Sequence, residues 1–74
     1  MSSKGQHVVP RGNGWAVQRS GAERASGIFT TQQEAIERAR EIARRNGAEL
    51  YIHGTDGRIR ERSSFGKEPL PTKG

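Results

Sequence analysis

The chain has 74 residues and a mass of 8.1 kDa, which is enough for one small domain. Thirteen lysines and arginines stand against eight aspartates and glutamates, so the formal net charge is +5 and the pI is about 10.8. The absence of cysteine excludes disulfides, thiol chemistry and cysteine-based zinc sites, and no apolar run approaches the roughly 18 residues of a membrane span. We therefore expect a small basic protein of the cytoplasm.

Both ends of the chain are polar and poor in apolar side chains. Residues 1–5 read MSSKG, and the last ten residues include Pro69, Pro71 and Gly74. Such segments have little apolar surface to bury when the chain folds. We expect residues 1–5 and 67–74 to be flexible tails on either side of a single small α+β domain over residues 6–66.

Three short strands are predicted in the first half of the domain. Residues 7–9 form the first strand, which Pro10 ends because proline has no N–H to donate. Asn13 and Gly14 tolerate positive φ angles and suit a hairpin turn. Residues 15–19 predict a second strand, and residues 25–30 a weaker third one. This part of the chain is expected to form an antiparallel meander.

One helix is predicted over residues 31–46. Thr31 and Glu34 fit a capping box, in which Thr31 caps the first turn and Glu34 reaches back. Gly47 supplies the left-handed residue that ends a helix. The apolar stripe of this helix consists of Ala35, Ile36, Ala39, Ile42 and Ala43. Its alanines favour close approach of the helix to a sheet.

A hairpin is predicted after the helix, with strands over residues 49–53 and 58–62. Asp56 and Gly57 form the dipeptide that most strongly indicates a tight turn between two strands. The expected fold is therefore α+β in the order β-β-β-α-β-β. It has a single antiparallel sheet with one helix packed across one face and solvent on the other.

The core of so small a domain must be built from few side chains. Trp15 is the largest apolar residue, and the alternation along its strand places Val17 on the same face. We predict that Trp15 is the central core side chain and that it packs with Val17 against Ile36, Ala39 and Ile42.

Five segments also resemble a known family. They are residues 7–10 (HVVP), 13–17 (NGWAV), 31–35 (TQQEA), 47–50 (GAEL) and 53–60 (HGTDGRIR). Together they are similar to the small bacterial family called "domain of unknown function 2188" over about residues 6–66. The resemblance implies a short soluble bacterial protein. It carries no established activity, cofactor or catalytic residue to this chain.

Few residues suggest catalysis or metal binding. His7 and His53 could be neighbours on adjacent strands, but they are interpreted as partly exposed strand histidines, since structural zinc needs four ligands. Ser26, Ser63 and Ser64 have no recognisable base partner. The two glycine-rich turns do not open a helix, as a phosphate-binding loop would. We expect no enzyme and predict no catalytic residue, metal, cofactor, small-molecule substrate or membrane partner.

The basic residues favour a binding function. Arg58, Arg60 and Arg62 alternate, so a regular strand would place all three on the open face of the sheet, opposite Ile59. Such a face suits weak contact with RNA or DNA through phosphates, with bases stacked on an aromatic ring. The candidate binding residues are Arg19, Arg24, Tyr51, His53, Arg58, Arg60 and Arg62.

Two other interpretations remain open at this point. The chain could be a protein-interaction or self-association module, for example a homodimer, that pairs through an edge strand at residues 7–9 or 58–62. Alternatively, the arginines merely solvate the open face and protect an edge of the sheet.

Overall fold

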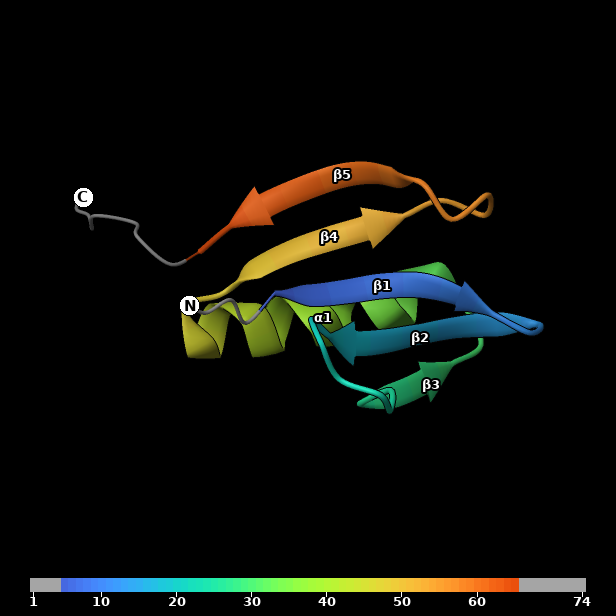
Figure 1. Ribbon diagram of the computed structural model, residues 1–74, viewed down its shortest axis with the longest axis horizontal. Helices are drawn as coiled ribbons and strands as arrows, with labels where there is room; N and C mark the ends of the chain where they lie inside the picture. The colour runs from blue at the N-terminus through green and yellow to red at the C-terminus, as the bar shows by residue number, and fades with distance from the viewer. Residues whose placement is uncertain (1–4, 66–74) are drawn as a thin grey trace.

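The computed structural model describes residues 5–65. Three strands, β1 (Gln6–Arg11), β2 (Gly14–Arg19) and β3 (Gly27–Phe29), precede a helix, α1 (Gln32–Asn46). Two more strands follow, β4 (Glu49–His53) and β5 (Ile59–Ser64). The order of elements along the chain is the predicted one, and the class is α+β. Figure 1 shows α1 lying behind the sheet, which leaves the other face of the sheet without a second layer.

The strands form one five-stranded mixed sheet in the order β3-β2-β1-β4-β5. The prediction of an antiparallel sheet is wrong at one pair, because β1 and β4 are parallel, with Val8 opposite Ile52. The physical reason is the path of the chain. It runs back along α1 behind the sheet and enters β4 from the end at which β1 begins (Figure 1), and such a helical crossover produces parallel neighbours.

The hydrophobic core lies between α1 and the sheet. Ala35, Ala39 and Ala43 of α1 are completely buried, as the helical spacing of the alanines predicted. The sheet contributes the buried side chains Val8, Val17, Leu50 and Ile52. Because alanine has a short side chain, the helix axis can lie close to the strands.

Trp15 is not the central core residue that the sequence suggested. The largest completely buried side chains are Leu50, Val8 and Val17, whereas Trp15 is partly buried and packs against their cluster. The reason is its place at the end of the first hairpin, where Trp15 pairs with Pro10. The central strand is β1, and its buried Val8 stands opposite Val17 of β2 and Ile52 of β4, away from the turn of that hairpin.

Both predicted helix caps are present. The Thr31 side chain accepts a hydrogen bond from the N–H of Glu34 at 3.2 Å. The carboxylate of Glu34 reaches back, but it accepts from the hydroxyl of Thr30 rather than from the N-cap residue. Gly47 ends the helix with φ 61°, in the left-handed region. These contacts satisfy backbone groups that have no partner within the helix.

Gly5 lies at the boundary of the described residues. The sequence placed it in the N-terminal tail, but Gly5 is buried and its carbonyl accepts a hydrogen bond from the N–H of Ser20 at 2.8 Å. The remainder of the two predicted tails lies outside the described residues. Within residues 5–65, α1 is too short and too polar to cross a membrane, and no other helix is present.

Candidate functional site on the open face of the sheet

The strand register defines which side chains share the face opposite α1. His7 pairs with Gln18 on one side and with Tyr51 on the other. Tyr51 in turn pairs with Arg62 on β5. Directly opposed residues project from the same face of a sheet. These four side chains therefore form a row across β2, β1, β4 and β5, which we call the central row.

A second contact links this row to the β4–β5 turn. Nδ1 of His7 lies 3.0 Å from Nε2 of His53, although the two residues are 46 positions apart. Nε2 of His7 lies 2.9 Å from Oγ of Ser20 at the end of β2. Nδ1 of His53 lies 2.8 Å from the carbonyl oxygen of Gly57. We call this chain of side chains, Ser20–His7–His53, the histidine relay.

The direction of hydrogen bonding in the neutral relay follows from its end groups. A carbonyl oxygen can only accept, so Nδ1 of His53 must carry a hydrogen. Nε2 of neutral His53 then accepts from Nδ1 of His7, and Nε2 of His7 accepts from the Ser20 hydroxyl. Burial, followed by the neighbouring charge of His53, lowers the pKa of His7 below its ordinary value.

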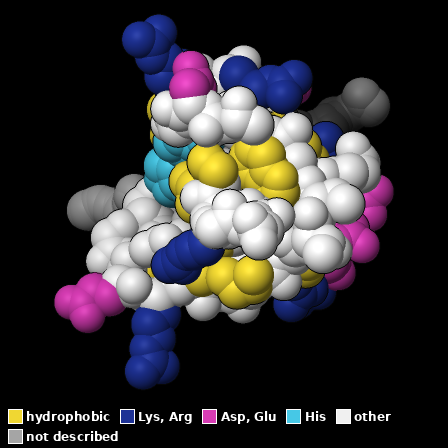
Figure 2. Space-filling view, turned by 90° about the vertical axis from the view of Figure 1, so that its right-hand side faces the viewer, with side chains coloured by type: hydrophobic (Ala, Val, Ile, Leu, Met, Phe, Trp, Pro, Cys, Tyr) yellow, Lys and Arg dark blue, Asp and Glu magenta, His cyan; other side chains and the backbone are white. Residues whose placement is uncertain are grey.

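The aromatic member of the central row is Tyr51. Its ring stacks on the His7 ring with a centroid separation of 4.7 Å and an interplanar angle of 19°. The Tyr51 hydroxyl donates to Oε1 of Glu49, and this hydrogen bond raises the pKa of the Tyr51 hydroxyl. Histidine side chains reach the molecular surface in Figure 2, on the side of the open face. The arrangement offers a stacked ring pair next to several hydrogen-bonding groups.

The three alternating arginines do not share one face, contrary to the sequence prediction. The register of β4 and β5 shifts between Ile52 and His53, so Ile59 rather than Arg60 stands opposite His53. Such a bulge adds one residue to a strand and reverses the alternation of the side chains that precede it. Arg62 consequently lies on the open face opposite Tyr51, and Ile59, expected toward the helix, is 53% exposed.

The other two arginines of this hairpin have separate environments. Arg60 donates to Oε1 of Gln32, at the first turn of α1, with a separation of 3.4 Å. Arg58 lies in the turn, where its Nε is 3.9 Å from Oδ2 of Asp56 and both side chains are mostly exposed. Of the three, only Arg62 belongs to the central row.

The remaining candidate arginines lie away from the central row. Arg19 pairs with Gln6, whose side chain faces α1, and is itself exposed. Arg24 is exposed in the connection between β2 and β3. The structure therefore brings together Tyr51, His53 and Arg62 from the predicted set. It adds His7 and Ser20, which the sequence analysis did not select.

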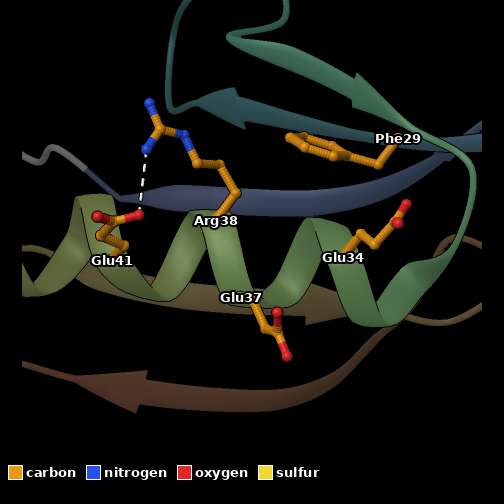
Figure 3. A pocket seen from close by; sticks show the side chains of 5 residues that line it. All are labelled: Phe29, Glu34, Glu37, Arg38 and Glu41. Atoms are coloured by element: carbon orange, nitrogen blue, oxygen red, sulfur yellow. Dashed lines mark hydrogen bonds and ion pairs between the residues drawn. The ribbon is translucent and has the colours of Figure 1, made fainter.

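The opposite side of the molecule carries acidic groups. A shallow depression beside α1 is lined by Phe29, Glu34, Glu37, Arg38 and Glu41 (Figure 3). Arg38 is paired with Glu41 at 3.1 Å, so this depression has an excess of negative charge. This negative charge would repel phosphate groups. The open face of the sheet is therefore the better candidate for contact with a polyanion.

Metal ligands are sparse in the part of the chain that the structure describes. No group of three or more histidine, cysteine, aspartate or glutamate side chains there is arranged to hold a metal ion. His7 and His53 alone provide fewer than the four ligands of structural zinc. Their facing nitrogens are already joined by a hydrogen bond, so the relay is a proton-bearing arrangement.

Comparison with known proteins identifies relatives. Residues 6–65 match the family described as "Uncharacterized protein conserved in bacteria (DUF2188)". Over 66 residues, the chain is 42% identical to "Uncharacterized protein YdaT" of Bacillus subtilis (strain 168), and this alignment covers 89% of the chain and 44% of that protein. The chain thus spans less than half the length of this relative. No solved structure matches it.

Proposed function

The chain belongs to the bacterial DUF2188 family of uncharacterised proteins, and from its structure we propose that it is a small module that binds single-stranded nucleic acid weakly on the open face of its sheet. The observation that carries this proposal is the stacking of Tyr51 on His7, 4.7 Å apart between ring centroids, at the centre of a sheet backed by a helix. A flat ring that is partly exposed on a sheet can stack with any base, because every base has a π face.

The position of the two rings supports this use. They lie on β1 and β4, which are parallel and adjacent at the middle of the sheet. RNA-recognition motifs use aromatic side chains on the open face of a four-stranded sheet to stack two or three bases. The comparison concerns arrangement alone, since function follows from the site and not from the fold.

Charge supplies the second part of the argument. The chain carries a formal net charge of +5, and the row of rings is flanked by Arg62 on β5. Arginine forms bidentate contacts with phosphate and also stacks on bases. Because only one arginine of the hairpin lies in the central row, few phosphates would be neutralised. We propose weak binding with a shallow salt dependence and little sequence preference.

Fluorescence anisotropy with a labelled uridine oligonucleotide of about ten residues tests the proposal. Tyr51→Val removes the stacking ring but keeps a strand-forming residue, whereas Tyr51→Phe keeps the ring and loses only the bond to Glu49. We expect Tyr51→Val to weaken binding at least about fivefold, the lower range for loss of one stacked base, and Tyr51→Phe to leave it nearly unchanged. Wild-type binding no tighter than about 10⁻⁴ M, the level of an unspecialised basic surface, would refute the proposal.

Pairing through an edge strand is the second candidate function. Of the two strands considered for this role, β1 lies inside the sheet, whereas β5 is an outer strand of six residues whose first residue, Ile59, exposes 53% of its surface. An unpaired strand edge can add to a partner's sheet or to a second copy. Light scattering at two concentrations would detect self-association as a rise in mass. Edge pairing, unlike phosphate contact, should persist as salt increases.

A catalytic role is the weaker interpretation of the histidine relay. Ser20, His7 and His53 stand in the order of a nucleophile, a base and an orienting group. Acyl transfer also requires N–H donors aimed at the developing oxyanion, and the N–H of Ser20 is bound to the carbonyl of Gly5. We therefore propose a binding module that acts in the cytoplasm without a cofactor, and not an enzyme.

A further inference from the structure

The two ends of the histidine relay respond differently to a proton. The carbonyl oxygen of Gly57, 2.8 Å from Nδ1 of His53, accepts a hydrogen bond in every protonation state. The hydroxyl of Ser20, 2.9 Å from Nε2 of His7, can donate or accept by rotating. Ser20 can therefore change its role when His7 becomes charged, without any movement of the strands.

The relay has room for one additional proton. In the neutral pair, the hydrogen on Nδ1 of His7 fills the 3.0 Å space between the two rings. An added proton can sit on Nε2 of His7, and Ser20 then accepts from it. A second added proton would have to sit on Nε2 of His53. The N–H groups of two charged rings would then point at each other across the 3.0 Å contact. The geometry of the contact therefore admits one added proton, on Nε2 of His7, while the two rings stay hydrogen-bonded.

We infer that His7 and His53 form a one-proton switch, which adds a positive charge to the open face and thereby strengthens its binding of single-stranded nucleic acid at lower pH. This inference rests on the proposed function, since it regulates the same surface. It extends that proposal from a fixed basic face to one whose charge depends on pH. Histidine is the side chain suited to such a change near neutral pH.

The surroundings make one charge significant. In the strand register, the charged residues of the open face are Arg11 on β1, Glu49 on β4 and Arg62 on β5. Glu49 is bound by the hydroxyl of Tyr51. In the β4–β5 turn, Asp56 and Arg58 offset one another. The two arginines and one glutamate give the open face a net charge of +1. Uptake of one proton by the histidine pair raises this net charge to +2.

Nuclear magnetic resonance of the histidine side chains tests the switch without nucleic acid. At about pH 8, long-range ¹H–¹⁵N spectra should show both rings as Nδ1–H tautomers. Lowering the pH from about 8 should add a single proton to the two rings together while their nitrogens remain 3.0 Å apart. Either ring in the Nε2–H form at about pH 8, or uptake of two independent protons, would overturn the inference.

Binding is then compared at about pH 5.5 and about pH 8 with a labelled uridine oligonucleotide, which has no group that titrates in this range. We expect tighter binding at the lower pH and a log–log salt slope steeper by about 0.7, the change for one more phosphate neutralised on a single strand. In the double variant His7→Gln, His53→Asn, the affinity and the salt slope should be the same at both pH values. Circular dichroism confirms that this variant folds.

Two further variants separate the inference from the proposed function. Arg62→Gln should reduce the salt slope equally at both pH values and leave the pH difference intact. Arg40→Gln removes one exposed charge on α1, away from the open face. It should change neither the salt slope nor the difference in binding between the two pH values. Binding with the same slope at both pH values overturns only the switch. Absence of binding at both pH values overturns the proposed function and the switch together.

Discussion

Gly5 lies so close to Tyr51 that a Cβ atom on the glycine would be 2.8 Å from Cε2 of the tyrosine ring and 3.0 Å from Oγ of Ser20. Gly5, which precedes β1, thus lies against the Tyr51 ring and against Ser20 of the histidine relay. The hydrogen bond between the Gly5 carbonyl and the N–H of Ser20 holds it there. Only a residue without a side chain fits this position without moving one of the two neighbours.

Gly5→Ala is therefore expected to destabilise the protein by about 1–3 kcal/mol, the usual cost of forcing an additional methyl group into a packed site. Urea unfolding measures this loss, and nuclear Overhauser effects between the rings of His7 and Tyr51 should weaken. In a Tyr51→Val background the same substitution should cost less, because the closest obstructing atom is gone. An equal cost in both backgrounds would show that the ring is not the obstacle.

The helix–sheet spacing gives a second prediction. Ala39 is completely buried between α1 and the strands, whereas its neighbour Arg40 is exposed. Ala39→Leu should reduce the free energy of unfolding by about 1–3 kcal/mol, since the added atoms push the helix from the sheet. Arg40→Leu introduces the same leucine on the exposed side of the helix and should alter stability by less than about 0.5 kcal/mol. If the two substitutions reduced the free energy of unfolding by the same amount, the close packing of α1 against the sheet at Ala39 would be contradicted.

A third prediction concerns the start of α1. Thr31→Ala removes the oxygen that accepts from the N–H of Glu34 and should cost about 1 kcal/mol. Thr31→Ser keeps a hydroxyl at the same place and should retain most of the stability. Thermal unfolding followed by circular dichroism compares the two variants. If both lose the same amount, the methyl group of Thr31 and not its oxygen is the stabilising group.

The helix was predictable because its signals are local. Thr31, Gly47 and the alanine spacing act over a few residues, and the structure confirms the caps and the buried alanines. The parallel pairing of β1 and β4 could not be predicted in this way, because it depends on where the chain returns after α1. Trp15 is displaced from the centre of the core for a different reason, because it stands opposite Pro10 next to the turn of the first hairpin.

The site was partly predictable. Alternation along the strands placed Tyr51 and His53 on the open face, and it raised the possibility that His7 lies beside His53. The bulge at Arg60 gives no signal in an alternating sequence, so the expected arginine face was wrong. Ser20 could have been found, because the hairpin register places His7 opposite Gln18, and Ser20, two residues after Gln18 and just beyond β2, continues the alternation on the same face.

The last prediction is that stability falls as the pH is lowered through the titration of His7. Its pKa in the folded protein is lowered by burial and by His53, whereas in the unfolded chain it is near its ordinary value of about 6.5. The unfolded state therefore binds more protons just below that value, and the free energy of unfolding rises with pH in this window. The stabilisation is fully present above about pH 6.5 and is lost as the pH falls toward the folded-state pKa of His7.

Urea unfolding at about pH 7.5, 6.5 and 5.5 measures this dependence, with conditions kept above the range in which carboxylates titrate. The decrease attributable to His7 should be less than about 1 kcal/mol, since the ring is partly exposed and solvent screens its interactions. His7→Asn should flatten the profile, because the titrating group is absent. A wild-type protein that becomes more stable at lower pH would show instead that the charged relay is favoured by folding, with the Ser20 hydroxyl accepting from His7 strongly enough to outweigh burial.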